Sequence, residues 1–221
     1  MRAVDQLITI DGIASNTGGG GGTVAFDAVS TKSASGLPSD SWRHIPVGVP
    51  TAIAVCIAYT SNATAITTVT YGGVAMTLEA TINTAGTHKV AIYGLANPPP
   101  GAQDVGIVWA AAVSHISAAV SVVGSHLGDP FSNNQTATGV GTAVTLNCAS
   151  VAGELVLDVV VSDTIASFTQ TGGQTKRWDL TVGTFQAAGS TKPAVGASTT
   201  MAWTLGASGT WAQAAASFRQ P

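Results

Sequence analysis

The segment Ala-Ile-Ala-Val-Cys-Ile-Ala-Tyr, residues 52–59, decides the fold class. Its large side chains, from Ile53 to Tyr59, alternate with small ones, and a period of two with β-branched residues predicts a β-strand. Just downstream, residues 67–71 and 74–78 flank Gly72-Gly73. A glycine pair between two strand-like runs predicts a tight two-residue hairpin.

Strand-like patterns continue to the C-terminus, and no stretch shows the capped apolar period of 3.6 residues that is typical of a helix. The uncharged stretch 105–124 carries serines and His115 near its middle. These polar groups disfavour a membrane-spanning helix. We expect two strands and a turn there, with His115 as a polar turn residue. The alanine-rich segment 211–218 is also expected to be a strand.

The sequence resembles itself after a shift of about 100 residues. The strand at 54–59 matches 154–159, and Gly72-Gly73 matches Gly172-Gly173. At an offset near 94, Trp109 meets Trp203. These matches predict an internal duplication with pseudo-repeats at about 50–126 and 150–221.

Each predicted half carries about five strands, too few to bury its apolar faces alone. Two antiparallel sheets packed face to face would bury both. We therefore expect an all-β, antiparallel β-sandwich of jelly-roll-like form. A single domain is expected to span residues 23–221.

Residues 1–22 are expected to form an N-terminal extended arm that contacts a partner. Leu7, Ile8 and Ile10 make one short strand-like patch, and Gly18–Gly22 are five consecutive glycines. Ordering such glycines costs backbone entropy and returns no side-chain burial. We expect the patch to contact another subunit, either a copy of this chain or a capsid protein.

The surface is expected to be polar but nearly uncharged. Charged residues make up 9% of the chain, against about 25% in an average domain. Such a surface suits coverage by a partner or a place outside the cell, but a threonine-rich β protein can also use hydroxyls for solubility alone. The net charge is −3, and the eight Lys and Arg are scattered. Nucleic-acid binding is therefore not expected.

No motif for catalysis, cofactor binding or metal binding stands out. The four histidines are far apart in sequence, and Cys56 and Cys148 lie in apolar runs that favour buried free thiols. Asp158 and Asp163 are interpreted as turn-capping or solvent-facing residues. A Ser-His-Asp triad assembled from distant segments stays open at this point. We expect no enzyme, no cofactor and no metal.

Trp42 and Trp178 are the tryptophans most suited to an exposed partner contact, because both sit beside charged residues. The other interpretation is a core or rim position for each. Trp109 and Trp203 are expected in the core of their halves.

Four stretches resemble a loosely characterised sandwich domain of phage virion proteins and bacterial surface proteins. They are Val-Thr-Tyr-Gly-Gly-Val-Ala-Met-Thr-Leu (69–78), Tyr-Gly-Leu-Ala-Asn-Pro-Pro-Pro-Gly (93–101), Asp-Pro-Phe (129–131) and the run from Ser190 to Leu205. The resemblance covers about residues 52–218 and consists of turns and core positions. It implies a fold and a place in a virion or on a cell surface, and it carries over no catalytic residue.

Two functions are expected from these features. The first is a capsid decoration or cement protein in a phage virion, with itself as partner (a trimer is one arrangement) together with a major capsid protein. The absence of a signal peptide at the N-terminus fits release by lysis. The second is a carbohydrate-binding or adhesive module of a bacterial surface protein, outside the cell. Neither involves membrane insertion.

Overall fold

The computed structural model describes residues 22–60 and 64–221, and all regular structure in them is β-strand. The predicted arm therefore lies outside the described residues, apart from Gly22. The strands are β1 (Ala25–His44), β2 (Ala52–Thr60), β3 (Ile66–Tyr71), β4 (Val74–Ala75), β5 (Thr77–Asn83), β6 (His88–Ala96), β7 (Gln103–Val123), β8 (Phe131–Ala149), β9 (Leu155–Ser162), β10 (Phe168–Gln170), β11 (Thr175–Val182), β12 (Phe185–Pro193) and β13 (Ser198–Phe218).

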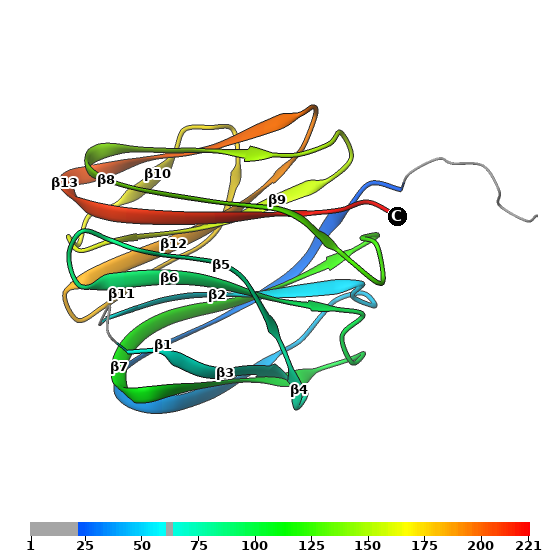
Figure 1. Ribbon diagram of the computed structural model, residues 1–221, viewed down its shortest axis with the longest axis horizontal. Helices are drawn as coiled ribbons and strands as arrows, with labels where there is room; N and C mark the ends of the chain where they lie inside the picture. The colour runs from blue at the N-terminus through cyan, green and yellow to red at the C-terminus, as the bar shows by residue number, and fades with distance from the viewer. Residues whose placement is uncertain (1–21, 61–63) are drawn as a thin grey trace, which may run out of the picture.

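The strands form two antiparallel sheets, each from one continuous half of the described chain (Figure 1). The first sheet has the order β4-β3-β7-β2-β6-β5, and β1 pairs with β7. The second has the order β10-β13-β9-β12-β11, and β8 pairs with β13. The all-β, antiparallel prediction is confirmed. So is the Gly72-Gly73 hairpin, whose glycines have φ of 56° and 80° between the paired residues Tyr71 and Val74.

The strand orders of the two sheets correspond. If β1, β2, β3, β5, β6 and β7 are replaced in turn by β8 to β13, the first order becomes the second, and β4 is the extra strand among the described residues. A register shift lies between Leu78 and Ala80 in β5, and another lies between Lys176 and Trp178 in β11. A bulge therefore occurs near the same point of two corresponding strands.

The two sheets face each other across a shared apolar core. In β2 the small residues face this core, whereas the large ones, such as Ile57, face the opposite side. In β9 the residues that face it include Leu157. A shift of 100 residues places Ile57 on Leu157, although Ile57 faces away from the shared core and Leu157 faces it. The predicted alignment of these two strands is therefore wrong by an odd number of residues. Because strand side chains alternate between faces, an odd slip exchanges inside and outside.

Each sheet also curls into a half-barrel with a core of its own. In the second half the bend lies in β13, whose pairing with β8 shifts between Thr204 and Gly209. The bend returns the strand onto itself, so that Gln213 Nε2 donates to the carbonyl of Met201 at 3.3 Å. The alanine-rich segment 211–218 is confirmed as part of this strand.

The expectation of two strands and a turn over 105–124 is wrong, because β7 runs without a reversal from Gln103 to Val123. Its partner β1 is nearly as long and pairs with it at both ends. His115, Ser117 and Ser121 lie on the face of β7 that also carries Val113 and Ala119 of the first half-barrel core. His115 is fully buried there, and is not a turn residue.

Candidate interaction surface

Five connecting segments meet at one end of the molecule. They are residues 45–51, 97–102, 124–130, 150–154 and 194–197. Backbone bonds join them: Asn97 N donates to the carbonyl of Thr51 at 2.9 Å, and Ser150 N to that of Ala197 at 3.2 Å. Val24 N donates to the carbonyl of Gly153 at 2.9 Å. The described chain therefore begins at this end, and it also ends there (Figure 1).

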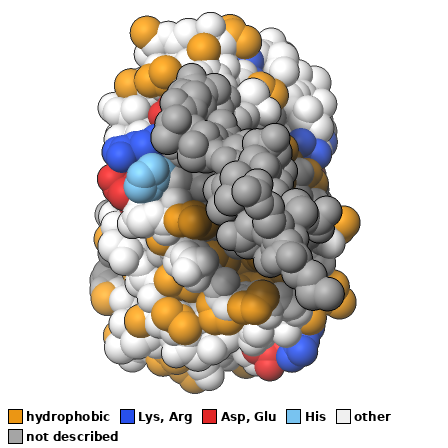
Figure 2. All heavy atoms as spheres, turned by 90° about the vertical axis from the view of Figure 1, so that its right-hand side faces the viewer, with side chains coloured by type: hydrophobic (Ala, Val, Ile, Leu, Met, Phe, Trp, Pro, Cys, Tyr) orange, Lys and Arg blue, Asp and Glu red, His pale blue; other side chains and the backbone are white. Residues whose placement is uncertain are grey.

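Exposed apolar side chains gather on these loops. Of the twelve exposed large hydrophobic residues among those described, six lie here: Ile45 (67% exposed), Val47 (87%), Val49 (76%), Leu127 (59%), Val151 (55%) and Val195 (86%). We call these six residues the arm-side surface. Figure 2 looks onto this end and shows orange side chains in its middle and lower part, with few charged ones among them.

Proline explains why part of this surface stays out of the sheets. In Ile45-Pro46-Val47-Gly48-Val49-Pro50 each proline lacks the N–H that a strand needs for pairing. The loop is nonetheless tied down, because Asp27 accepts from Val47 N at 3.2 Å and from Gly48 N at 2.7 Å. The valine side chains therefore point outward from a fixed loop. Apolar residues between two prolines are the sequence signal that could have identified them.

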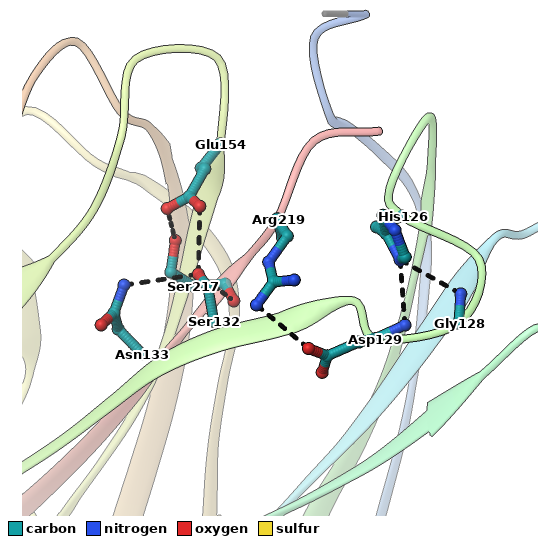
Figure 3. Close-up of polar contacts among 8 residues, drawn as sticks. All are labelled: His126, Gly128, Asp129, Ser132, Asn133, Glu154, Ser217 and Arg219. Carbon is teal, nitrogen blue, oxygen red and sulfur yellow. Dashed lines mark hydrogen bonds and ion pairs between the residues drawn. The ribbon is translucent and has the colours of Figure 1, made fainter.

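The segment 124–130 is held in place by His126 and Arg219 (Figure 3). His126 Nδ1 accepts from Gly128 N at 3.2 Å and from Asp129 N at 3.0 Å. Arg219 N donates to the carbonyl of Pro130 at 2.6 Å, and the Arg219 guanidinium pairs with Asp129 at 3.0 Å. These bonds fix a tight turn that directs Leu127 into solvent.

An apolar hollow of about 480 Å³ lies on this segment. Its walls, almost entirely apolar, come from Thr51, Gly124, Ser125, His126, Leu127, Gly128 and Pro221. Gly124 has a φ of 73°, and a side chain there would meet the carbonyl oxygen of Thr23. The hollow therefore lies directly beside the point where the chain preceding Thr23 enters the domain.

An acidic hollow of about 430 Å³ lies against the other side of segment 124–130. Thr77, Glu79, Asp129 and Phe131 are among its lining residues. Gly94 gives it room, because a side chain at that position would overlap the Phe131 ring. Burial raises the pKa of Glu79, Asp129 raises it further, and a hydrogen bond from Asn134 opposes the rise. The hollow thus combines two carboxyl groups, a hydroxyl and an aromatic ring.

The predicted partner contacts are placed very differently. Leu7, Ile8 and Ile10 lie outside the described residues. Trp42 is half-buried, and its Nε1 donates to Ser30 Oγ at 3.0 Å.

Trp178 is only 6% exposed, so its expected exposed contact is wrong. Its indole covers Gly189 of the neighbouring strand β12. The charged neighbours of Trp178 did not indicate its own exposure, because adjacent residues of a strand point to opposite faces. Exposed charges beside a tryptophan therefore do not require the tryptophan itself to be exposed.

A Ser-His-Asp contact, left open by the sequence, is present in the first half-barrel. His115 lies 2.9 Å from Ser117 Oγ through Nδ1 and 3.2 Å from Asp40 Oδ2 through Nε2. Burial lowers the pKa of His115, and Asp40 opposes that shift. Ser117 is fully buried, so its hydroxyl is closed to a substrate in this structure. The contact satisfies polar groups inside the half-barrel.

Asp158 is the centre of a buried network in the second half-barrel, and the interpretation as a turn or surface residue is wrong. It lies on β9 and is fully buried. Its carboxylate accepts from Ser190 N at 2.9 Å and Ser190 Oγ at 2.5 Å, and from Trp203 Nε1 and Gln213 Nε2 at 2.7 Å each. Burial raises its pKa to about 6, and these hydrogen bonds oppose the rise.

A second buried acid, Glu154, joins the start of β8 to the end of β13 near the arm-side surface (Figure 3). It accepts from Ser132 Oγ at 3.0 Å, Ser217 Oγ at 2.5 Å and Val151 N at 3.0 Å. Val151 is thereby fixed at the edge of the surface. The role of Glu154 is to hold loops in position.

Cys56 and Cys148 are free and buried, as expected. Within residues 22–60 and 64–221, no group of three His, Cys, Asp or Glu side chains is arranged to hold a metal ion. Over the same residues, no helix has the length and apolar character needed to span a membrane.

Comparison with family models, with curated proteins and with solved structures finds no match to any of them.

Proposed function

We propose that this chain is a non-enzymatic structural protein of a phage particle, a capsid decoration or cement protein that stabilises the shell through subunit contacts. The observation that carries the proposal is the arm-side surface. Monomeric soluble proteins rarely expose large contiguous apolar patches, and such patches mark interaction sites. Here six large apolar side chains are exposed on loops at the end where the described chain begins, at Gly22.

The partner chemistry follows from the composition of this end. The centres of protein interfaces are depleted in charge, and the arm-side surface itself carries none. The exposed charges next to it, Asp129 and Arg219, pair with each other. A flat apolar partner, such as another copy of the chain or a major capsid protein, fits this chemistry. The proposed location is the virion, and a homotrimer is one proposed assembly.

The edges of the sheets support a role for the arm. Among the described strands, β1 pairs only with β7 and β8 pairs only with β13. Each therefore leaves one edge unpaired within the described chain, and an extended segment can add to such an edge by main-chain hydrogen bonds. The patch Leu7-Ile8-Thr9-Ile10 has the β-branched composition that suits an added strand.

The fold is proposed to be a sandwich of two duplicated halves. The corresponding strand orders and the bulges in β5 and β11 support this origin. In a jelly roll built from Greek keys, long connections cross between the sheets, whereas here each sheet uses one half of the chain. A two-halved sandwich is therefore proposed in place of the jelly roll.

Two sets of variants test the proposed function. Val47→Asp with Val195→Asp places charges on the arm-side surface, and Val140→Asp is a matched control because Val140 is 72% exposed on β8, away from that end. Native mass spectrometry would measure self-association. Co-sedimentation with shells of the phage's major capsid protein would measure decoration. We expect the double variant to lose both activities and the control to keep them.

Deletion of residues 2–22 tests the arm. The truncated chain is expected to melt cooperatively but to lose most of its assembly. Normal assembly after the deletion, or normal assembly of the double variant Val47→Asp with Val195→Asp, would overturn the proposed function.

A carbohydrate-binding or adhesive module at a cell surface is the second candidate, and the acidic hollow favours it. Sugar hydroxyls can bond to Glu79 and Asp129, and a sugar ring can stack on Phe131. A glycan array with the native chain and with Glu79→Gln distinguishes the two candidates. Binding that is lost in Glu79→Gln would favour the module.

A further inference from the structure

We propose that, in the unassembled protein, the apolar segment Leu7-Ile8-Thr9-Ile10 docks into the apolar hollow of its own chain. The arm is then stored against the domain until a partner takes its place. Release of the arm to a partner rests on the proposed function, whereas docking itself concerns the free chain and is tested without a partner.

The hollow fits the segment in size and chemistry. Pockets that hold small molecules have volumes of about 300–1,000 Å³, and this one has about 480 Å³ with walls that are mostly apolar. It is therefore large enough for several aliphatic side chains. A charged or strongly polar ligand would find few partners on these walls, whereas leucine and isoleucine side chains remove apolar surface from water.

The hollow is fixed before anything binds. His126 bonds to Gly128 N and Asp129 N, and its own backbone N donates to the carbonyl of Arg219 at 2.9 Å. On the opposite side, Thr51 Oγ1 lies 2.7 Å from Ser125 Oγ. A site held in this way loses little conformational freedom when a segment binds.

The tether is long enough for the segment to reach the hollow. Gly124, in the wall, lies against Thr23, and Ile10 precedes Gly22 by twelve residues. Twelve residues span at most about 40 Å, which is ample reach to a neighbouring hollow. A short linker also gives an effective concentration on the order of millimolar. At lower protein concentrations, docking within one chain therefore prevails over docking between copies.

The glycine run allows the chain to turn back toward the hollow. Five consecutive glycines, Gly18–Gly22, impose few steric limits on the direction of the chain. The polar residues between Ile13 and Gly18 offer the hollow no apolar competitor except Ala14. Residues 7–10 carry three large apolar side chains in four positions and are close enough along the chain to reach the hollow.

Disulfide trapping in the full chain tests the proposal. Ile8→Cys is combined with Leu127→Cys in the hollow, or with Val195→Cys as the control, since Val195 is 86% exposed at the same end of the molecule but does not line the hollow. The native thiols do not interfere because Cys56 and Cys148 are both buried. Non-reducing gels and intact mass would follow oxidation at low micromolar protein.

We expect the Leu127 pair to close within one chain at least about tenfold faster than the Val195 pair, at a rate independent of dilution. Equal rates for the two pairs, or disulfide-linked dimers as the main product, would overturn docking within the chain.

A second measurement does not depend on cysteine placement. Leu7→Asp with Ile8→Asp should free the hollow, so that binding of a hydrophobic fluorescent dye rises and hydrogen exchange at 124–128 speeds up. Thr9→Asp adds a charge to the same segment without removing a large apolar side chain, and is expected to have a much smaller effect. Identical dye binding and exchange in the native chain and the double variant would contradict the proposal.

Discussion

Replacing Asp158 tests whether its buried hydrogen bonds hold the second half-barrel together. The carboxylate accepts from Trp203, Gln213 and Ser190, and all of these groups are buried. In Asp158→Ala the donors of Trp203 and Gln213 lose this acceptor. An orphaned buried donor costs about 1–3 kcal/mol, so we expect a loss of about 4 kcal/mol from the free energy of unfolding.

Asp158→Asn should cost less. The amide oxygen can still accept from Trp203 and Gln213, and the amide nitrogen can donate to Ser190 Oγ once that hydroxyl rotates. The backbone N–H of Ser190 then has no acceptor, which costs about 2 kcal/mol. With a urea m-value of about 2 kcal/mol/M, the midpoint of unfolding falls by about 1 M.

The difference in the free energy of unfolding between the native protein and Asp158→Asn is expected to depend on pH. Burial raises the folded pKa of Asp158 to about 6, from the ordinary value of 3.8 for an aspartate. A raised folded pKa contributes stability that is complete below the unfolded value and is lost as pH rises through 6. The stability difference between the native protein and Asp158→Asn should therefore widen by about 2 kcal/mol from pH 7 to pH 4.

Urea unfolding followed by tryptophan fluorescence at both pH values measures these differences. Asp104→Asn is the control, because Asp104 is an exposed partner of Arg43, and exposed pairs contribute about 0–1 kcal/mol. If Asp158→Ala cost no more than this control, Asp158 would not be the centre of the network. A difference that narrowed toward pH 4 would refute the raised pKa.

Three further predictions follow from buried groups. Burial lowers the pKa of His44 to about 4, and the nearby Asp27 opposes this shift. The neutral His44 therefore contributes stability above pH 6.5, and this contribution is lost as the pH falls toward 4. In His44→Gln the free energy of unfolding, measured by urea titration, should depend less on pH between 6.5 and 4. Gly189→Ala brings a methyl group within 2.4 Å of Trp178 Nε1 and should cost about 1–3 kcal/mol, whereas Gly196→Ala, which meets nothing within 4 Å, should leave the melting temperature unchanged. Burial also raises the pKa of the Cys56 thiol, so a thiol reagent at pH 8 should label it only after unfolding, and rapid native labelling would show that the core is open.

Sequence patterns predicted the strands better than their faces or their lengths. The alternation in 52–59 correctly indicated β2, but it did not tell which side of the strand faces the shared core. That core takes the small residues, because the large ones fill the curled interior of the half-barrel. Period-two patterns are symmetric between the two faces, so the match at an offset of 100 could slip by one residue.

Long bent strands were also beyond sequence reasoning. Polar residues near His115 indicated a turn, yet His115 bonds to Ser117 and Asp40 inside the half-barrel. A buried polar group is tolerated when its partners are present, and those partners, such as Asp40, lie 75 residues away along the chain. The same argument applies to Asp158, whose partners come from β12 and β13.

The sequence by itself determined the all-β class, the tight Gly72-Gly73 turn, the buried thiols and the low charge, because each depends on local spacing or on composition. Only the tertiary structure decided that Trp178 is buried, that loops far apart in sequence form one arm-side surface, and that a hollow lies beside the start of the domain. Those features depend on which segments meet at one end of the molecule. Strand order and the bending of β7 and β13 decide which segments meet there. No single residue carries a local signal for the strand order or for the bending.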